Sequence, residues 1–449
     1  MAVVDGSVVS IALPTITGYF HVSLAKSQWI MTSYLVTLTS LLLIFGRVAE
    51  YTGRARLFFL GTGLFTISSL ACGLSSSLEM LILFRVIQAT GAAMMFSISA
   101  AIIFLSFPRG EQGRAMGYIG ATVAIGSIIG PTLGGLIVDL LGWEYIFLIN
   151  VPIGIAQLLL STRYMKIEDK RSSSLKVDGI GAVTLIIFMV SLMALLGDLS
   201  TSFALQPAIV AMALLFIISL CAFLVNESRQ KEPLLDLEIF RYRDFVLSSI
   251  SMLIFFIANL SISVLGPFYF QGVRGYSASQ VGMIYLIVPA IMVIGAPITG
   301  WIYDKRPCRY LAAAGMLIIT VSIMIQGYLA GRTDTDPRML LSTFVPMGIG
   351  CVLFQSPNNT EIMRDLPREK MNIASSVTAT IRNLGMALGV SLSGIVVSFQ
   401  LSGAGYYGTV LEAGSGLLAT TISRGIILAG LLCFIGAMAS FLRGRCSAG

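Results

Sequence analysis

The feature that most constrains this chain is a succession of long apolar stretches separated by short polar breaks. A helix rises about 1.5 Å per residue, so about 20 apolar residues cross the hydrocarbon core of a bilayer. Only 11% of the residues are charged, against about 25% in an average soluble domain. The sequence therefore predicts an all-α polytopic membrane protein with about fourteen transmembrane helices. The fourteen stretches are residues 1–19, 28–46, 57–74, 78–105, 113–141, 144–162, 177–197, 203–225, 245–270, 279–302, 310–330, 338–357, 371–400 and 421–442.

Lysine and arginine are distributed unevenly between alternate loops. If the first loop lies outside, 22 of the 29 basic residues fall in loops on one side of the membrane. The loops on the other side hold only Lys26, Arg274, Arg332 and Arg338. Cytoplasmic loops collect Lys and Arg, so we expect a multi-pass protein of the cell membrane with both termini in the cytoplasm. The loops also explain the net charge of +7 without a nucleic-acid partner.

Two longer polar connections suggest a division of the chain. Residues 163–176 read RYMKIEDKRSSSLK, and residues 226–244 read NESRQKEPLLDLEIFRYRD. The apolar residues of the second connection suit a short helix lying along the membrane surface. We expect an N-terminal bundle of six helices (1–162), two linking helices with flanking loops (163–244) and a C-terminal bundle of six helices (245–449).

A charged residue lies inside the fourth apolar stretch. Arg85 and Gln88 are three positions apart and share one face of a helix, and the small Gly91 follows on the same helix. An arginine at that depth costs a few kcal/mol, so Arg85 should face the protein interior, and small residues such as Gly91 let another helix approach closely. The alternative is that Arg85, seven residues from the polar start of the stretch, reaches the interface from the helix end.

The loop after the second stretch concentrates charge and glycine. It reads GRVAEYTGRAR (46–56), and the loop GWIYDKRPCRY (300–310) repeats its pattern of a glycine followed four residues later by an acid. An acid at a helix end can accept hydrogen bonds from N–H groups at the start of a neighbouring helix, and the arginines can reach carboxylates or lipid phosphates. This loop would then be a latch between two bundles. The alternative is an ordinary basic cytoplasmic loop.

Glycine also recurs every four residues in the fifth stretch, which reads GSIIGPTLGG at 126–135. Gly126, Gly130 and Gly134 would form a smooth face for close helix packing, and Pro131 removes a helical hydrogen bond. Such a tight fit could seal the membrane against leak. A generic small-residue packing face is the alternative.

Taken together and in this order, these motifs resemble the major facilitator superfamily, and within it the fourteen-helix drug:proton antiporters. The resemblance covers nearly the whole chain. The matching residues are VVDGSVVSIALPTI (3–16); Gly46, Glu50, Gly53, Arg54 and Arg56; Arg85, Gln88 and Gly91; Gly126, Gly130, Pro131, Gly134 and Gly135; FLINVPIGI (147–155); PFYFQGVRGYSASQVG (267–282); FQSPNNT (354–360); and ASSVTATIRNLGMALGVSLSG (374–394).

The chain departs from the family pattern in three places. Glu50 stands where the family usually has Asp, and Tyr51 where a basic residue is common. The second-half loop is degraded. The family's first helix normally has a longer apolar run before the acid that matches Asp5, whereas only four residues precede Asp5 here. We therefore expect the first helix to be truncated, with residues missing before Met1.

The resemblance implies a fold of two six-helix bundles plus two linking helices. It also implies a proton-coupled exporter of lipophilic, often cationic drugs or related small compounds that works by alternating access between two bundles. Asp5 and Arg85 are then the candidates for proton coupling, because desolvation favours a protonated carboxyl and a nearby cation favours the ionised one. Polar residues of the second half are candidates for the cavity lining or for ordinary interhelical bonds: Asn259, Gln271, Gln355, Asn358 and Asn383.

Other classes of function fit the sequence less well. An exporter of one metabolite or a lipid keeps the same fold and stays open as an alternative. A membrane-embedded enzyme would need clustered His or acids, and the chain has one histidine, His21. The six cysteines show no metal-ligand or paired spacing, and no Gly-Lys dipeptide supports an ATP site. We expect no cofactor or metal, and a monomer in the bilayer whose partners are protons and a small-molecule substrate.

Overall fold

The structure, a computed structural model, describes residues 2–21, 29–108, 110–164, 178–201, 207–230, 234–235, 237–276, 278–308, 310–332, 336–364, 366–367, 370–406 and 414–443. Each of the fourteen predicted stretches is helical over most of its described residues, and the prediction of an all-α membrane fold is confirmed. Among the described residues, 12 helices are long and apolar enough to cross a membrane. The other two predicted stretches are α1 and α6.

The helices of the first half and the linking region follow the predicted order. They are α1 (Ala2–Tyr19), α3 (Trp29–Thr52), α4 (Arg54–Gly73), α5 (Leu78–Ser106), α6 (Gln112–Leu140), α7 (Tyr145–Leu148), α8 (Asn150–Tyr164), α9 (Gly179–Thr201) and α10 (Pro207–Arg229). The short α7 and the longer α8 together make the sixth apolar stretch.

The second half contains more interruptions. It consists of the 3₁₀ helix η1 (Leu237–Arg241), α11 (Arg243–Phe268), the π-helix η2 (Tyr269–Val273), α12 (Ala278–Tyr285), α13 (Ile287–Lys305), α14 (Tyr310–Ala330), α15 (Pro337–Ser342), α16 (Phe344–Arg364), α17 (Met371–Gly403) and α18 (Ser415–Phe441). The π-turn follows Pro267, which lacks a backbone donor and so disturbs the helical hydrogen bonds.

Local sequence explains where several helices begin. The Ser77 side chain caps α5 by accepting a hydrogen bond of 3.1 Å from the Met80 N–H, as expected of an N-cap serine. Asp336 caps α15 in the same way, with Pro337 at the first helical position. Gly53 separates α3 from α4 with a φ of 88°, a left-handed conformation that favours glycine.

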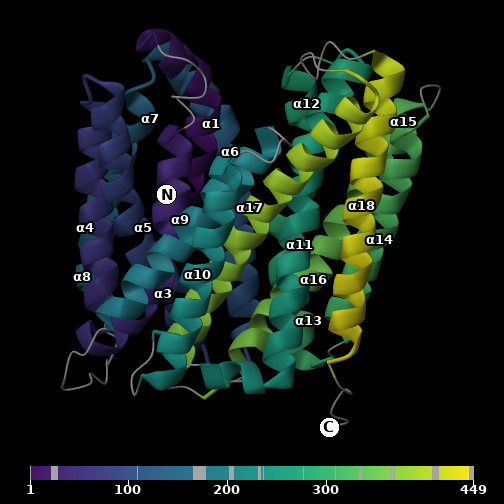
Figure 1. Ribbon diagram of the computed structural model, residues 1–449. Helices are drawn as coiled ribbons and strands as arrows, with labels where there is room; N and C mark the ends of the chain where they lie inside the picture. Colours follow the sequence, from purple (N-terminus) through teal and green to yellow (C-terminus); the bar gives the residue numbers. More distant parts are fainter. Residues whose placement is uncertain are drawn as a thin grey trace.

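The helices form two groups that lie side by side (Figure 1). The helix α17 runs obliquely from the second group toward the first. In the first group α3, α4 and α5 pack on one another, and α1 packs on α6. In the second group α11 packs on α17 and α18, and α14 packs on α16 and α18. The linking helices α9 and α10 pack on each other, and α9 also contacts α3 and α17. The two groups meet chiefly where α6 contacts α13 and where α17 contacts α3 and α5.

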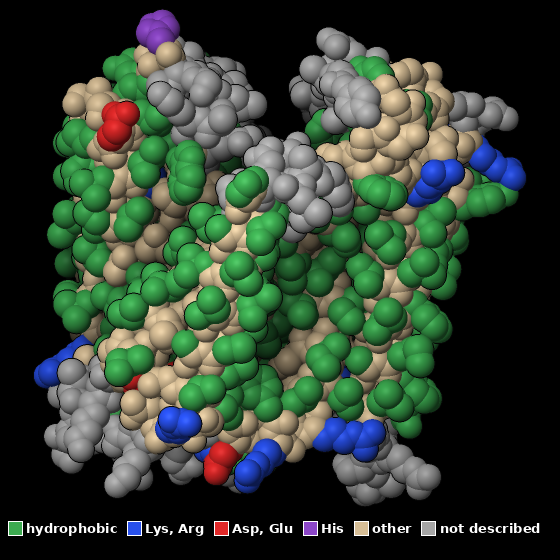
Figure 2. Space-filling view, viewed as in Figure 1, with side chains coloured by type: hydrophobic (Ala, Val, Ile, Leu, Met, Phe, Trp, Pro, Cys, Tyr) green, Lys and Arg blue, Asp and Glu red, His purple; other side chains and the backbone are tan. Residues whose placement is uncertain are grey.

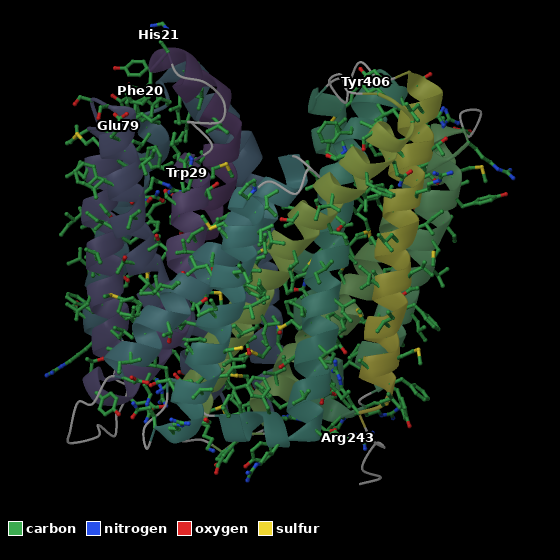
Figure 3. The ribbon with its side chains drawn as sticks, in the orientation of Figure 1. Phe20, His21, Trp29, Glu79, Arg243 and Tyr406 are labelled. Atoms are coloured by element: carbon green, nitrogen blue, oxygen red, sulfur yellow. The ribbon has the colours of Figure 1, made fainter. Side chains whose placement is uncertain are left out.

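The two ends of the helical bundle differ in charge. Most of the Lys and Arg side chains visible in Figure 2 lie at its lower end, which we call the basic end. Figure 3 places Arg243 at this end, and it places His21, Trp29, Glu79 and Tyr406 at the opposite end. Figure 2 shows a notch between two lobes at the opposite end and a continuous surface at the basic end, and Figure 3 places Glu79 on one lobe and Tyr406 on the other.

Candidate functional site

The first feature of the candidate site is a buried ion pair between α1 and α5. The Arg85 guanidinium lies 2.6 Å from an Asp5 carboxylate oxygen, and both side chains are only 1% exposed. Arg85 therefore faces the protein interior, as the cost of a charge in the bilayer predicted, and does not reach the interface. Removing one partner of such a pair typically costs 3–5 kcal/mol, because the other charge stays buried and uncompensated.

A ring of polar groups completes the coordination of this pair. Gln88 Nε2 and Asn150 Nδ2 donate to the second Asp5 oxygen at 3.2 and 3.0 Å. Arg85 also donates to Gln88 Oε1 at 2.6 Å and to the Ile30 carbonyl at 3.2 Å. The Asp5 carboxylate thus accepts from three side chains, which come from α5 and from the start of α8. The site joins four helices of the first group through one carboxylate and one guanidinium.

Aromatic rings cover the guanidinium. The centroid of the Tyr34 ring is 4.1 Å from the Arg85 Cζ atom, and that of Phe147 is 5.6 Å away. Each such contact stabilises a partly desolvated cation by about 0.5–2 kcal/mol. The Tyr34 hydroxyl is buried and has no hydrogen-bond partner in the part of the chain that the structure describes.

Sequence reasoning missed Asn150, Ser69 and Tyr34 as members of this site. Asn150 belongs to the motif FLINVPIGI, which was noted without a role, and a polar residue inside an apolar stretch was the available signal. Ser69 accepts a hydrogen bond of 2.7 Å from Gln88. A serine or a tyrosine in a membrane helix is too common to signal a site, so no sequence signal distinguishes Ser69 or Tyr34.

The predicted latch loop does join the two groups at the basic end. Arg54 donates from Nε to Asn372 Oδ1 at 2.5 Å, linking α4 to the start of α17. Gly46 lies against the same helix so closely that a Cβ there would be 2.3 Å from Ser376 Oγ. Glu50, the acid of the motif, forms an ion pair with Arg47 within its own helix.

The related acid of the second half makes the contact that was expected of such loops. Asp304, at the end of α13, accepts from the backbone N–H groups of Gly113 and Arg114, both at 2.8 Å. These N–H groups belong to the first turn of α6, where unsatisfied donors and the helix dipole favour a carboxylate. The loop that is degraded relative to the family therefore carries the acid-to-helix contact between the two groups.

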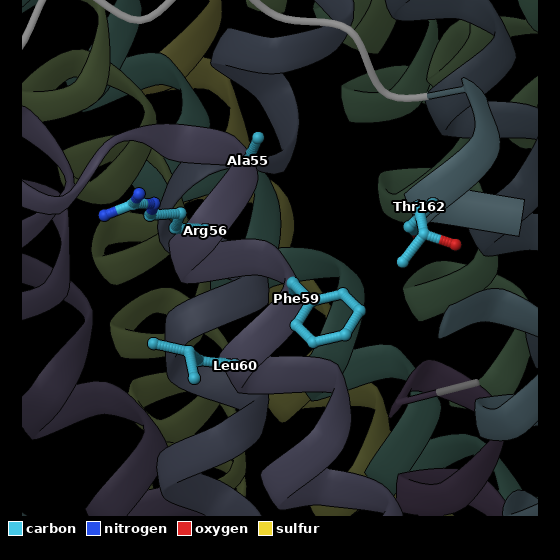
Figure 4. A pocket seen from close by; sticks show the side chains of 6 residues that line it. Ala55, Arg56, Phe59, Leu60 and Thr162 are labelled. Carbon is cyan, nitrogen blue, oxygen red and sulfur yellow. The ribbon is translucent and has the colours of Figure 1, made fainter. Parts of the chain in front are cut away.

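The other predicted motif residues lie at different places. Arg56 lines a pocket of about 310 Å³ between α4 and α8, away from the Asp5 site (Figure 4). Gly91 is buried against α4, where a Cβ would be 2.7 Å from the Gly61 carbonyl. Gly126 and Gly130 are buried in α6, and a Cβ on Gly134 would be 2.9 Å from the Val8 side chain of α1. Pro131 and Gly135 are helical, but their surroundings lie outside the described part of the structure.

A second set of glycines in α6 faces the other group of helices. A Cβ on Gly117 would be 2.4 Å from the Ala296 carbonyl of α13, and one on Gly113 would be 2.7 Å from the Gly300 carbonyl. The tight contact of α6 with the second group therefore runs through Gly113 and Gly117. The predicted glycines Gly126, Gly130 and Gly134 lie further along α6, where Gly134 packs against Val8 of α1.

Another buried ion pair lies in the second group. Arg443 Nη1 is 3.0 Å from a Glu361 oxygen, and the Tyr303 hydroxyl donates to the other Glu361 oxygen at 3.1 Å. Arg443 is 0% exposed. Arg443 lies just beyond the end of α18, as the pattern of apolar stretches predicts, but its side chain is buried rather than exposed as in an ordinary loop.

The candidate cavity residues divide into two kinds. Asn358 and Asn383 are buried; Asn358 donates to the Ser248 carbonyl at 3.3 Å and Asn383 to the Ala379 carbonyl at 2.8 Å. They are therefore structural in this conformation. Asn259 and Gln355 are partly exposed, and their side chains form no hydrogen bond within the described ranges. The side chain of Gln271 lies outside the described residues.

The Asp5 site places one carboxylate beside one guanidinium inside the protein. No cluster of His, Cys, Asp and Glu that could hold a metal ion occurs among the residues described. The carboxylate and the guanidinium compensate each other's charge in a buried site.

Comparisons with known proteins agree with this architecture. A family model described as Major Facilitator Superfamily matches residues 1–390. The chain is 31% identical over 438 residues to the riboflavin transporter RibZ of Clostridioides difficile, covering 97% of this chain and 93% of that protein. It is 30% identical over 395 residues to the multidrug export protein EmrB of Escherichia coli K12, covering 88% of this chain and 77% of that protein.

Solved structures share the fold at low sequence identity. The human organic anion transporter MFSD10 superposes with a TM-score of 0.62 at 15% identity, covering 96% of each chain. The proton:xylose symporter XylE superposes with a TM-score of 0.63 at 13% identity, covering 96% of this chain and 92% of that one. These likenesses concern the fold alone.

Proposed function

The chain belongs to the major facilitator superfamily, and on that premise we propose that it is a proton-coupled secondary active transporter that exports lipophilic small compounds. The observation that carries the proposal is the buried pair of Asp5 and Arg85, 2.6 Å apart and enclosed by polar groups and aromatic rings. A charged pair at this position costs desolvation energy and is retained where a titratable group is needed inside the membrane.

Proton binding and helix movement are linked through this pair. When Asp5 takes up a proton, its attraction to Arg85 is lost, and the guanidinium must find other acceptors, such as Gln88 Oε1 and the Ile30 carbonyl that it already contacts. Gln88 belongs to α5 and Ile30 to α3, and these two helices pack on each other. Protonation therefore favours a different arrangement of α1, α3 and α5, and release of the proton favours the arrangement described above.

Alternating access then requires the contacts at the basic end to break. The bonds from Arg54 to Asn372 and from Asp304 to α6 hold the two groups together at that end, whereas the opposite end has a notch. We assign the basic end to the cytoplasm because cytoplasmic loops collect Lys and Arg. The conformation described is then the outward-facing one, and both termini are cytoplasmic in a multi-pass protein of the cell membrane.

The same assignment gives each part of the chain a role in transport. Residues 1–162 would act as one rocking bundle and residues 245–449 as the other, with residues 163–244 as linking helices between them. Transporters of this kind bind substrate between such bundles near the middle of the membrane. The protein would act as a monomer, with protons and a small-molecule substrate as its partners.

The names of the relatives point to two classes of substrate. Relatives named as multidrug export proteins favour export of varied lipophilic drugs. A relative named as a riboflavin transporter supports the alternative of a single metabolite. A competition experiment separates them: a multidrug exporter is inhibited by many unrelated lipophilic compounds, and a metabolite exporter by close analogues of one compound.

The test of coupling is transport in proteoliposomes with an imposed pH gradient. Asp5→Asn keeps the size and hydrogen bonding of the side chain but removes its titration, so substrate accumulation driven by the gradient should be lost while binding persists. Glu50→Gln and Glu361→Gln serve as matched carboxyl controls. Accumulation by Asp5→Asn with the wild-type dependence on the gradient would overturn the assignment. Loss in Glu361→Gln alone would move the coupling acid to the second group.

A further inference from the structure

Arg382, inside a membrane-spanning helix, has no acidic partner among the residues that the structure describes. Arg382 lies in α17, eleven residues after the helix begins at Met371. At about 1.5 Å per residue this is about 17 Å along the helix from Met371, well inside a helix that is long enough to span a hydrocarbon core of about 30 Å. A charge at that depth costs several kcal/mol unless something compensates it.

Two fully buried arginines show how such a charge is compensated elsewhere in the protein. Arg85 is paired with Asp5, and Arg443 is paired with Glu361. Within the described ranges, Arg382 forms neither an ion pair nor a hydrogen bond, and its guanidinium lies 5.5 Å from the centre of the Phe96 ring. Its side chain is only partly buried. Most of its donors are therefore available to a molecule that enters the protein.

Arg382 also lies where the two groups of helices meet. Phe96 belongs to α5 in the first group, while α17 belongs to the second (Figure 1). Ala379, one turn earlier on α17, packs into a core cluster made of first-group residues. Residues three apart share one helical face, so Arg382 extends from the face of α17 that is turned toward α3 and α5.

The acidic residues of the sequence motifs do not neutralise the charge of Arg382. Asp5, Glu50 and Glu361 are engaged with Arg85, Arg47 and Arg443 respectively. Arg382 is therefore a positive charge without an ion-pair partner in the part of the chain that the structure describes. A positive site beside an aromatic ring attracts anions with flat apolar surfaces and repels cations.

We propose that Arg382 is the anchor for an anionic oxygen group, such as a carboxylate, on an aromatic compound that the protein transports. This inference rests on the proposed function as a transporter and specifies the substrate class. Arginine offers five donors in a planar fork that matches a carboxylate. The Phe96 ring beside it supplies an apolar surface for the aromatic part of the compound. Substrate binding would thereby supply the counter-charge that the helices do not.

The experiment measures equilibrium binding to purified protein in lipid nanodiscs without any gradient. The probes are fluorescein, which is anionic, and rhodamine 6G, which is a cationic ester on the same xanthene ring system; fluorescence polarisation reports both. The wild type should bind fluorescein more tightly than rhodamine 6G. Arg382→Gln should weaken fluorescein binding about tenfold or more, as expected for a lost hydrogen bond to a charged group, and should leave rhodamine 6G binding unchanged or tighter.

Two further variants control the result. Arg424→Gln removes the same charge from an exposed position of α18 and should alter neither affinity. Arg382→Lys keeps the charge without the planar fork and should retain part of the preference for fluorescein. This variant also keeps the test informative if Arg382→Gln fails to fold. If the Arg382→Lys protein binds fluorescein as poorly as it binds rhodamine 6G, the proposal is contradicted.

Other outcomes contradict the role of Arg382 without testing whether the protein is a proton-coupled transporter. An equal loss of both probes in Arg382→Gln would mean that Arg382 supports the structure, for example by pairing with an acid in another conformation. Absence of fluorescein binding to the wild type would also refute the anchor. Proton-driven accumulation of rhodamine 6G in proteoliposomes, measured in parallel, tests the proposed function independently of Arg382.

Discussion

The contact between Asp304 and the first turn of α6 offers the sharpest test of how the two groups of helices are held together. One carboxylate accepts two N–H groups across the interface, each at 2.8 Å, and the Arg364 guanidinium lies 3.4 Å from the same carboxylate. The Asp304 side chain is 5% exposed, so solvent screens these interactions little. We therefore expect Asp304→Asn to destabilise the conformation that is closed at the basic end.

The size of the effect follows from the geometry. Asparagine keeps one oxygen acceptor, so the substitution removes one hydrogen bond to a charged group and the favourable charge at a helix N-terminus. The first loss is about 1.5–3 kcal/mol and the second about 0.3–1 kcal/mol. If movement of the amide recovers part of this, a net loss of about 2 kcal/mol remains, which lowers the odds of the closed conformation about 30-fold. Asp304→Ala, which keeps no acceptor, should lower them further.

Spin-label distances between the two lobes at the opposite end measure the populations of the conformations that are closed and open at the basic end. Cysteines at the exposed positions Glu79 and Ala404 carry the labels, after Cys221, Cys308 and Cys446 have been replaced by serine. The wild type should give chiefly the long distance of the separated lobes. Asp304→Asn should add a population at a shorter distance, because opening of the basic end brings the opposite ends together.

Glu50→Gln is the matched control for this measurement. Glu50 is the acid of the equivalent loop in the first half, and its ion pair with Arg47 lies within one helix. Its removal should change the distance populations much less than Asp304→Asn. The reasoning is refuted if neither Asp304 variant shifts the populations, or if Glu50→Gln shifts them as far as Asp304→Asn does.

Three further predictions concern other parts of the molecule. Arg85→Ala should destabilise the protein by about 3–5 kcal/mol, with Arg85→Lys recovering only part of the loss, and thermal unfolding in detergent measures both. Gly117→Val should abolish or uncouple transport, because even a Cβ would be 2.4 Å from the Ala296 carbonyl, whereas Gly63→Val has open space and should transport normally in the same vesicle assay. Reporter fusions after Lys170 and after Lys231 should both read cytoplasmic, and opposite readings would contradict the paired crossing of α9 and α10.

Much of the fold was predictable because membrane insertion is decided locally. Each helix must satisfy its backbone hydrogen bonds within itself, so the length and apolarity of a stretch suffice to predict a spanning helix. The inward direction of Arg85 followed from the same reasoning, since a charge facing lipid is costly. Interruptions such as the break between α12 and α13 were not predicted, because the hydrophobic signal continues across them.

The partners of charged residues were predicted less well. The pattern of the two loops suggested that either acid could cap a helix, and only the structure assigns that contact to Asp304 and an ion pair within α3 to Glu50. Arg443 illustrates the same limit. Its position just beyond an apolar stretch indicates a loop residue, yet Glu361 from another helix lies 3.0 Å away and holds it inside the protein.

The sequence by itself determined that this chain crosses the membrane many times, that its basic loops lie on one side and that Arg85 cannot face lipid, because each of these follows from the free energy of placing one segment in the bilayer. The tertiary structure alone decided that Gln88 contacts both Arg85 and Asp5, and that Asn150 from another helix donates to Asp5. It also decided that Arg382 faces an aromatic ring with no acid among the described residues beside it. The physical reason is that these partners come from helices far apart in the chain, and only the packing of backbones at small residues determines which side chains come within hydrogen-bonding distance.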